Sequence, residues 1–352
     1  MNFKVLDLGI SNIRNKIVES LYFNFGFDFT RPVQIYGVVN NRCNSKCKMC
    51  DYWRIKDPEE LPASVWIKGL KSLKSFVGIF HINLSGGEVL LKKDFFEILE
   101  YCKKENISVG FTTNGLLLNR DNIQRILDLN VFNINISLDS MDDTINDGIR
   151  GFPGSLAKLK ENIDILTAQK QKGRKASRII LKPTVCSENL NGLDKIVEYA
   201  QRMNLAGINF QPIFKWSKES EEMFKVEKKD LVAMIDKLVQ MKKEGYNILN
   251  SEASIRQWLP HFNEEIPERN SPCTVALRNL NIISNGDVSM CGFRESKIGN
   301  IKNDDFREMW HSEKTQKLRK ALVNCKRLCT ATCVIKRSWK DYIDLFVKLM
   351  EG

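Results

Sequence analysis

The chain has 352 residues, of which 43% are hydrophobic and 28% are charged, and this composition excludes a chain dominated by disorder. The first residues lack the basic and apolar regions of a signal peptide, and no apolar run approaches the roughly 18 residues of a membrane span, which predicts a cytoplasmic protein. The net charge of +11 comes from lysines spread along the sequence rather than from a dense basic and aromatic patch, so nucleic acid is a disfavoured partner.

Ten cysteines occur in this chain, which has no export signal, and cytosolic thiols stay reduced. Three of them lie within residues 43–50 and three within residues 325–333. This clustering favours metal ligation over a disulfide framework.

Residues 1–32 precede the first predicted strand and form an N-terminal extension. From residue 33 to 213, short β-type runs alternate with helix-length amphipathic segments, which is typical of βα units around a parallel sheet. The predicted strands span residues 33–39, 79–85, 107–113, 131–138, 178–186 and 207–213. The predicted helices between them span residues 64–75, 94–104, 121–129, 154–170 and 190–203.

The fourth predicted strand alternates between an apolar and a polar face. Ile134 and Ile136 share one face, and Asn133 and Asn135 share the other. The matching polar positions of the other strands include Gln34, Tyr36, His81, Asn83, Ser85, Lys182, Thr184, Asn209 and Gln211. A closed eight-stranded barrel fills its interior with apolar side chains, so a polar interior predicts a partial, open (β/α)6 barrel with a polar lumen.

The rest of the chain changes in character. Its predicted parts are a helical connector at 214–270, a small α+β domain at 271–336 and a C-terminal helix at 337–352. The small domain contains a predicted hairpin with its turn at Asn285 and Gly286, followed by a helix at 304–321.

Three cysteines, Cys43, Cys47 and Cys50, directly follow the first strand, where βα barrels place their chemistry. Thiolates hold iron-sulfur clusters, and three thiolates leave one iron open to another ligand. Structural zinc is the alternative, but it requires a fourth ligand such as His81.

The segment RCNSKCKMCDYW closely resembles the CxxxCxΦC signature of the radical S-adenosylmethionine (SAM) superfamily, with Met49 as Φ and Tyr52 two positions after the last cysteine. The resemblance implies a [4Fe-4S] cluster that binds and reductively cleaves SAM, inside a partial (β/α)6 barrel over residues 33–213. It also implies that Met49 and Tyr52 lie near the adenine.

Further motifs occur in the order that the superfamily shows. The SGGE segment resembles its GGE motif, so Gly86, Gly87 and Glu88 are expected to receive the SAM amino group. Asn114, Ser137 and Asp139 are candidate contacts to the ribose or the methionyl group. Arg150 is the candidate partner of the SAM carboxylate, and Gln211 is a candidate contact to the adenine. Each motif alone is a common turn, and their order around the cysteines is what makes the resemblance specific.

The C-terminal cysteines resemble the SPASM or twitch extension of this superfamily, which carries auxiliary [4Fe-4S] clusters. They are Cys273, Cys291, Cys325, Cys329 and Cys333. The full SPASM pattern has seven cysteines, so five favour one auxiliary cluster with one cysteine to spare, and the spacing leaves the spare one open. Zinc is the alternative here too.

Catalytic candidates come from the predicted polar face. Lys182 and His81 could act as a base, or could be a carboxylate partner and a hydrogen-bonded strand residue. Cys186 could donate a hydrogen atom to a substrate radical or could be structural, whereas Cys102 is expected to be a small buried residue.

The implied chemistry begins with a 5'-deoxyadenosyl radical that abstracts hydrogen from a substrate carbon, followed by oxidation or epimerisation. The polar lumen predicts a polar small-molecule substrate such as a sugar, aminocyclitol or nucleotide sugar. The basic surface would suit a flavodoxin or ferredoxin as electron donor, although a solvated lysine-rich surface also explains the charge.

Three alternatives stay open. One is modification of a ribosomally made peptide, which about 32 residues before the first strand disfavour because they are too few for a separate leader-binding domain. The others are a non-catalytic iron-sulfur protein and a zinc-bound nucleic-acid protein.

Overall fold

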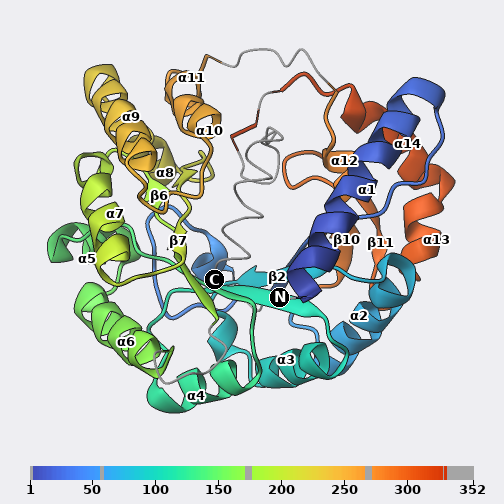
Figure 1. Cartoon of the computed structure of the whole chain (residues 1–352), viewed down its shortest axis with the longest axis horizontal. Helices are drawn as coiled ribbons and strands as arrows, with labels where there is room; N and C mark the ends of the chain where they lie inside the picture. The colour runs from blue at the N-terminus through green and yellow to red at the C-terminus, as the bar shows by residue number, and fades with distance from the viewer. Residues whose placement is uncertain (1–2, 56–58, 171–176, 266–271, 328, 331–352) are drawn as a thin grey trace.

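The computed structural model describes residues 3–55, 59–170, 177–265, 272–327 and 329–330, and its centre is a nine-stranded sheet (Figure 1). The strands follow one another in the sheet in the order β11-β10-β9-β1-β2-β3-β4-β5-β7, and β6 and β8 form a separate pair. The strand bounds are β1 Gln34–Asn40, β2 His81–Gly86, β3 Ser108–Thr113, β4 Asn133–Ile136, β5 Arg178–Leu181, β6 Thr184–Val185, β7 Gly207–Ile208, β8 Gln211–Pro212, β9 Asn279–Ile282, β10 Asp287–Ser289 and β11 Lys297–Asn300.

Helices line the outer side of the curved sheet, where Figure 1 shows α2, α3, α4 and α6 in succession around its rim. The α-helices are α1 Phe3–Phe25, α2 Ala63–Val77, α3 Phe95–Lys104, α4 Arg120–Asp128, α5 Asp143–Arg150, α6 Ser155–Lys170, α7 Leu193–Arg202, α8 Lys218–Met223, α9 Lys228–Lys243, α10 Glu252–Arg256, α11 Trp258–Phe262, α12 Val275–Arg278, α13 Phe306–His311 and α14 Glu313–Val323. The short 3-10 helices are η1 Tyr52–Arg54, η2 Val89–Leu91 and η3 Leu190–Gly192. The six parallel strands with outer helices confirm the predicted partial α/β barrel.

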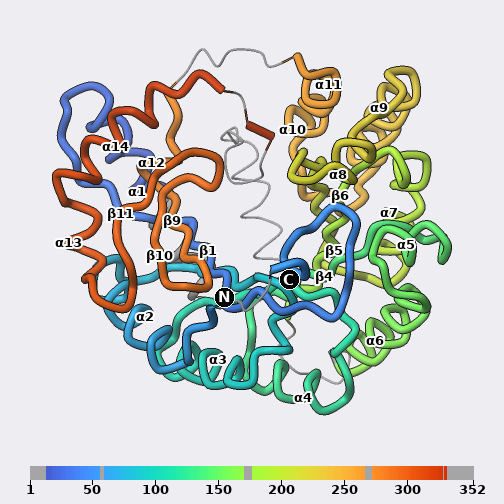
Figure 2. Tube along the Cα trace, turned by 180° about the vertical axis from the view of Figure 1, so that it is seen from behind, coloured from blue at the N-terminus to red at the C-terminus, as the bar shows by residue number. Residues whose placement is uncertain are grey.

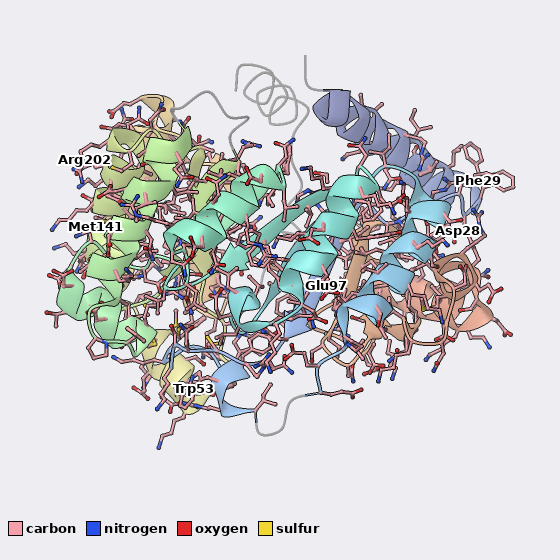
Figure 3. The ribbon with its side chains drawn as sticks, turned by 90° about the horizontal axis from the view of Figure 1, so that it is seen from below. Asp28, Phe29, Trp53, Glu97, Met141 and Arg202 are labelled. Carbon is pink, nitrogen blue, oxygen red and sulfur yellow. The ribbon has the colours of Figure 1, made fainter. Side chains whose placement is uncertain are left out.

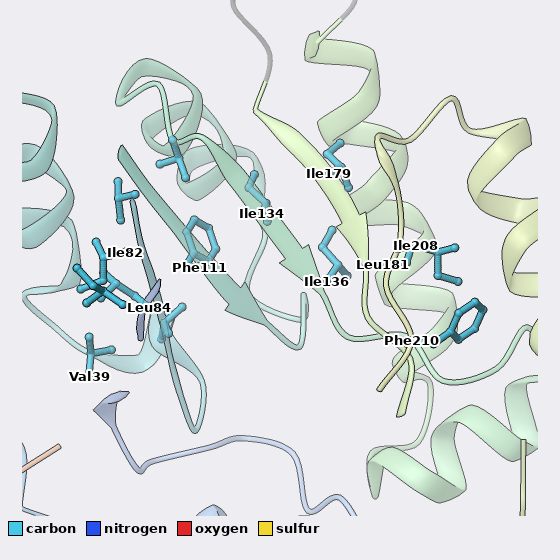
Figure 4. Packing of buried hydrophobic residues seen from close by; sticks show 14 of the residues in the cluster. Val39, Ile82, Leu84, Phe111, Ile134, Ile136, Ile179, Leu181, Ile208 and Phe210 are labelled. Atoms are coloured by element: carbon cyan, nitrogen blue, oxygen red, sulfur yellow. The ribbon is translucent and has the colours of Figure 1, made fainter. Parts of the chain in front are cut away.

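The core lies between the sheet and these helices. Leu84 and Phe111, and then Ile134 and Ile179, occupy neighbouring positions on successive strands, and all are buried (Figure 4). Full burial of such a side chain contributes about 1.5–3 kcal/mol, so this apolar layer fixes the strand register. The alternating polar residues consequently face the inside of the barrel.

Two predicted strands are interrupted. Residues 178–186 form β5 and β6, which are separated by Lys182 and Pro183, and a proline has no N–H for the ladder. Residues 207–213 likewise divide into β7 and β8, and β6 pairs with β8 outside the main sheet. The barrel is therefore splayed at this end.

The helices also differ from the prediction in two places. Helix α5 was not predicted, although Asp142 caps it by accepting a hydrogen bond from the Ile145 N–H at 3.1 Å and Gly151 ends it at φ +59°. The predicted helix at 304–321 is two helices, because Ser312 ends α13 and caps α14.

The C-terminal hairpin is continuous with the barrel. Strands β9 and β10 are antiparallel around the predicted turn, with Gly286 at φ +90°, and β9 pairs in parallel with β1 (Figure 2). The sequence did not indicate this pairing, because the partner strands are about 240 residues apart. The small domain is thus an extension of the barrel sheet.

The N-terminal extension is largely helix α1 and is tied to the C-terminal domain. Arg278 and Glu19 form a buried ion pair at 2.5 Å, and the Trp310 indole donates to the Thr30 carbonyl at 2.9 Å. Phe29 and Asp28, next to this contact, lie at the edge of the molecule opposite Arg202 and Met141 (Figure 3). The predicted helix at 337–352 lies outside the described residues, and none of the described helices has the length and apolarity needed to cross a membrane.

Candidate active site and metal centres

The loop after β1 holds the first cysteine group. Cys47 is buried, and Cys43 and Cys50 are half-buried. The loop is fixed by backbone contacts, in which the Lys48 N–H donates to Ile149 O at 3.0 Å and the Trp53 indole donates to Cys47 O at 3.1 Å. Burial raises the pKa of all three thiols, that of Cys43 to about 11, so a cationic group is needed to stabilise them as thiolates.

Two glycines allow the end of β2 to pack directly beneath this loop. Gly86 has φ +143°, and a Cβ there would lie 2.1 Å from Asn40 O. A Cβ on Gly87 would lie 2.1 Å from Arg42 O, next to Cys43. Only glycine permits such a close approach of two backbones, so the SGGE turn and the cysteine loop form one unit.

Glu88 is fully buried, and its carboxylate holds the turn after β3. It accepts hydrogen bonds from the Thr113 hydroxyl at 2.8 Å and the Asn114 N–H at 2.7 Å. Asn114 in turn donates to Ser45 Oγ at 3.2 Å and lies 3.8 Å from Cys43 Sγ. Glu88 therefore positions Asn114 against the cysteine loop.

Asp139 and Arg150 form a buried ion pair at 2.7 Å below the same loop. Asp139 also accepts a hydrogen bond from the Thr184 N–H at 2.7 Å, and Arg150 Nη1 lies 3.9 Å from Cys47 Sγ. Burial opposes the charge on Arg150, but Asp139 and Cys47 outweigh it and raise the pKa of Arg150. A permanent cation beside Cys47 suits a thiolate ligand of an iron-sulfur cluster.

The structure brings most of the predicted SAM residues to this edge of the sheet. Tyr52 begins the short helix η1 after Cys50, and burial raises its pKa, while Met49 packs partly against the core. Ser137 follows β4, where its N–H donates to Thr113 O at 3.0 Å. Gln211 instead lines the cavity that contains the C-terminal cysteines.

The barrel interior carries a network of polar side chains. Asn135 donates to Asn83 Oδ1 at 2.8 Å and to Thr112 Oγ1 at 3.4 Å, and Asn83 donates to the same hydroxyl at 3.2 Å. Asn133 donates to Asn135 Oδ1 at 3.1 Å. The predicted polar face is therefore real, and its groups bond to one another across three strands.

The three catalytic candidates lie in different surroundings. His81 begins β2, and its Nδ1 forms a hydrogen bond of 2.9 Å with Ser108 Oγ. Burial lowers the pKa of His81 to about 4. Cys186 is fully buried in the apolar core, which favours the structural alternative, and burial raises its pKa to about 12, so the thiol stays protonated. Lys182 is half-buried directly after β5, at the same edge as the cysteine loop.

Four of the five C-terminal cysteines line a single cavity of about 330 Å³. They are Cys273, Cys291, Cys325 and Cys329, and Cys333 lies outside the described residues. Within the described ranges, no three His, Cys, Asp or Glu side chains converge as ligands of a single metal ion. A [4Fe-4S] cluster does not need such convergence, because each thiolate binds a different iron.

Several residues around this cavity were not singled out from the sequence. Phe214, Trp216 and Phe293 line it beside Cys291, and His261 contacts Phe214 edge-on with ring centroids 5.4 Å apart. The sequence could have indicated Trp216, since a tryptophan in a charged connector is unusual. The other contacts depend on tertiary packing.

Three curated relatives show what the chain resembles in sequence. It is 26% identical over 261 residues to AdoMet-dependent heme synthase of Methanosarcina barkeri, covering 67% of this chain and 70% of that protein. It is 25% identical over 310 residues to the sporulation killing factor maturation protein SkfB of Bacillus subtilis, covering 88% and 72%. It is 30% identical over 224 residues to a probable GTP 3',8-cyclase of Methanococcus aeolicus, covering 58% and 70%.

Two solved structures share the fold. Streptococcus suis SuiB bound to its precursor peptide SuiA superposes with a TM-score of 0.66 at 16% identity, covering 86% of this chain and 70% of that one. The protein anSMEcpe with bound AdoMet and the Cp18Cys peptide superposes with a TM-score of 0.64 at 17% identity, covering 91% and 96%.

These relatives correct the substrate prediction. A sugar, aminocyclitol or nucleotide sugar was expected, yet the matches that span most of the chain include maturation proteins such as SkfB, and the neighbouring SuiB structure contains a precursor peptide. The prediction of a polar small molecule as partner is wrong for the same reason. It relied on lumen polarity, but the lumen amides bond to one another, and peptide backbones are polar as well.

The description of the chain as an oxidoreductase or epimerase is not supported by these relatives, which include maturases and a heme synthase. What they share with this chain is the family. Residues 38–200 match the family model of the radical SAM superfamily, and residues 273–334 match that of the SPASM iron-sulfur cluster-binding domain. The chain therefore belongs to the radical SAM superfamily, with a [4Fe-4S] cluster that binds SAM and a C-terminal SPASM domain for auxiliary iron-sulfur binding.

Proposed function

We propose that this chain modifies a ribosomally made peptide by radical SAM chemistry. The observation that carries the proposal is the match to SkfB, which extends over 88% of the chain and so includes both the barrel and the cysteine-rich domain. The sheet supports it, because β9 joins the barrel to the SPASM hairpin and leaves the lumen beside a second cavity. An extended peptide can contact both domains along this junction, whereas a small molecule needs only one enclosed pocket.

The bound cluster and SAM would supply one-electron cleavage and hydrogen abstraction from a substrate carbon. Around them, Gly86 and Gly87 bring two backbones together, and Asn114 holds the segment around Cys43. Arg150 keeps a positive charge beside Cys47. These contacts hold the loop and its sulfur atoms in place for a cluster.

We further propose that Cys273, Cys291, Cys325 and Cys329 hold one auxiliary cluster. All four line one cavity, and the Phe293 N–H lies 3.4 Å from Cys291 Sγ, where it can stabilise a thiolate. Such a cluster would accept an electron from a substrate radical and so favour oxidation or bond formation. Lys182, at the edge of β5, is the candidate base for the accompanying proton.

Anaerobically reconstituted protein incubated with SAM, dithionite and candidate peptides tests the function. We expect 5'-deoxyadenosine, together with a change in peptide mass and transfer of deuterium from labelled peptide. Absence of 5'-deoxyadenosine would reject catalysis, and labelling from deuterated sugars with unchanged peptides would reject the peptide substrate.

Iron analysis tests the auxiliary cluster separately. Two [4Fe-4S] clusters give about eight irons per chain, and Cys329→Ala should reduce this toward about four. Cys102→Ala is the matched control, because Cys102 is fully buried in α3 away from both cysteine groups and its loss should leave the iron content unchanged.

A further inference from the structure

Besides the cysteine-lined cavity, another cavity of about 600 Å³ opens between the connector and the SPASM domain. Five aromatic side chains line it, and we call it the aromatic cleft, defined by Phe214, Trp216, Phe224, His261 and Phe293. The rest of its lining includes charged side chains, namely Lys215, Glu264, Glu265 and Arg327. This volume is within the roughly 300–1,000 Å³ of small-ligand sites. The cleft is therefore large enough for one or two side chains of a bound peptide.

The rings of the aromatic cleft contact one another. Trp216 and Phe293 are stacked with centroids 5.8 Å apart and planes 10° apart, and Phe214 lies 5.0 Å from Phe293. His261 joins Phe224 to this group, with its ring centroid 5.0 Å from that of Phe224 and 5.4 Å from that of Phe214. Aromatic rings favour offset or edge-on contacts with other aromatic rings, so a further ring is a suitable ligand for this group.

Trp216 is held in place although its side chain is 59% exposed. Its backbone N–H donates to Ser220 Oγ at 2.8 Å, and Ser217 and Ser220 form the capping box that begins α8, while the stacking on Phe293 orients the ring. A fixed and exposed tryptophan loses little conformational entropy on binding, which is the property of residues that dominate recognition surfaces. Its environment is preorganised for a ligand.

The ring of His261 is also held in place. His261 bonds through Nε2 to Ile213 O at 2.8 Å and through Nδ1 to Thr330 Oγ1 at 3.1 Å. Burial lowers the pKa of His261, so the ring is neutral, donates to the carbonyl and accepts from the hydroxyl. The cleft therefore keeps its shape without a ligand.

The aromatic cleft is continuous with the cysteine-lined cavity. The two share Phe214, Trp216, Gly292, Phe293, Arg327 and Cys329 as wall residues. The cysteine-lined cavity in turn includes Tyr36 of β1 and Gln211 of β8, which belong to the barrel. A side chain bound in the cleft would therefore lie next to the site proposed for the auxiliary cluster, at the junction of the SPASM domain and the barrel.

We propose that the aromatic cleft binds an aromatic side chain of the substrate peptide and so selects the residue presented to the barrel. This rests on the proposed peptide substrate. A second protein copy is a poorer occupant, because a stable interface buries at least about 1,200 Å² and is flatter than a cavity between two walls. The cations Lys215 and Arg327, over the rings of Phe224 and Phe293, strengthen the aromatic lining.

The test measures binding without turnover. Ligand-observed NMR compares N-acetyl-Ala-Phe-Ala-amide, its Trp analogue and N-acetyl-Ala-Ala-Ala-amide on the reconstituted full chain without dithionite. We expect the aromatic peptides to bind at least about fivefold more tightly than the alanine peptide. Trp216→Ala and Phe293→Ala should remove this preference, and Trp216→Phe should retain most of it.

Phe27→Ala is the control, because Phe27 is 58% exposed and lies before β1 rather than in the cleft. Equal binding of all three peptides, or a preference that survives in Trp216→Ala and Phe293→Ala, would overturn the proposal. Because the test needs neither SAM cleavage nor a modified product, its failure is distinguishable from failure of the peptide-modifying function.

Discussion

At the scale of single residues, glycines decide how closely the cysteine loop can approach β2. Gly87 and Gly86 stand where a side chain would collide with the backbone oxygens of Arg42 and Asn40. Neither oxygen can move without moving the segment that carries Cys43. The cluster loop is therefore sensitive to a single added methyl group.

Gly87→Ala tests this sensitivity. The new Cβ would lie 2.1 Å from Arg42 O, so we expect the loop to be displaced and the N-terminal cluster to be lost. Iron content should fall toward about four per chain, with 5'-deoxyadenosine formation abolished. Gly148→Ala in α5 is the control, because nothing lies within 4 Å of its added Cβ. Normal iron in Gly87→Ala would contradict the steric argument.

His81 makes stability depend on pH. Burial lowers its folded pKa to about 4 from 6.5, so the unfolded chain binds more protons between these values. The stabilisation is complete above about pH 6.5 and is lost as the pH falls toward 4. Between about pH 7.5 and pH 5 the wild type should lose on the order of 2 kcal/mol that His81→Gln does not lose.

Urea unfolding at the two pH values measures this difference. His311→Gln is the comparison, because His311 is less buried and its pKa is lowered for the same reason. A pH dependence that is the same in the wild type and His81→Gln would show that His81 titrates normally in the folded chain.

Sequence reasoning found the residues of the site better than their contacts. The order of the motifs predicted that Glu88, Asn114 and Asp139 lie at one edge of the sheet. It did not predict that Glu88 binds the Asn114 backbone or that Asp139 binds Arg150, because those contacts depend on how β2, β3 and α5 pack. Candidate SAM contacts and residues that position the cysteine loop look alike in sequence.

At the scale of elements, α8 connects the first cysteine loop to the aromatic cleft. Arg54 of η1 forms an ion pair with Glu219 of α8 at 2.7 Å, and Trp216 directly precedes the cap of α8. Hydrogen bonding to Arg54 lowers the pKa of Glu219 to about 2, so this carboxylate stays ionised at neutral pH. The pair is exposed and should be sensitive to salt.

Glu219→Gln tests the connection. We expect amide hydrogen exchange to rise about twofold to fivefold in both η1 and α8, because an exposed ion pair contributes modestly. Glu222→Gln is the matched control, since Glu222 pairs with Lys225, three residues further along the chain, rather than with η1. An unchanged η1 in Glu219→Gln would mean that the two elements are independent.

The predicted elements were wrong where the structure depends on contacts with segments distant in the sequence. Proline at 183 was a visible reason for a break in the fifth strand, yet the pairing of β6 with β8 requires knowing how the strands align. Helix α5 was not predicted despite Asp142 and Gly151 at its ends, because its 8 residues are too few to show a clear helical period. Helices such as α3 and α6 were predicted to within a few residues.

At the scale of the whole molecule, barrel and SPASM domain share one sheet. Leu280 of β9 is 1% exposed and faces Ile35 of β1 in register. Leu280→Ala should cost about 2–5 kcal/mol and lower a single cooperative unfolding transition seen by both circular dichroism and tryptophan fluorescence. Ile283→Ala, at a residue 43% exposed, should have little effect. Two separate transitions in Leu280→Ala would show that the domains unfold independently.

The fold class followed from the alternation of elements, whereas the substrate did not. Strand polarity described the lumen wall correctly, but side chains such as Asn83 and Asn135 satisfy each other and carry little information about what enters. The peptide substrate emerged from relatives that match both domains, a comparison that a single sequence does not contain.

The pairing of β9 with β1 also bears on aggregation. Without it, β1 would present an unpaired edge of seven residues, a template for association between copies. With it, the outermost strand on that side is β11, which has four residues and begins with the exposed Lys297. A short, charged edge discourages strand addition, so the auxiliary domain also keeps concentrated copies of the enzyme apart.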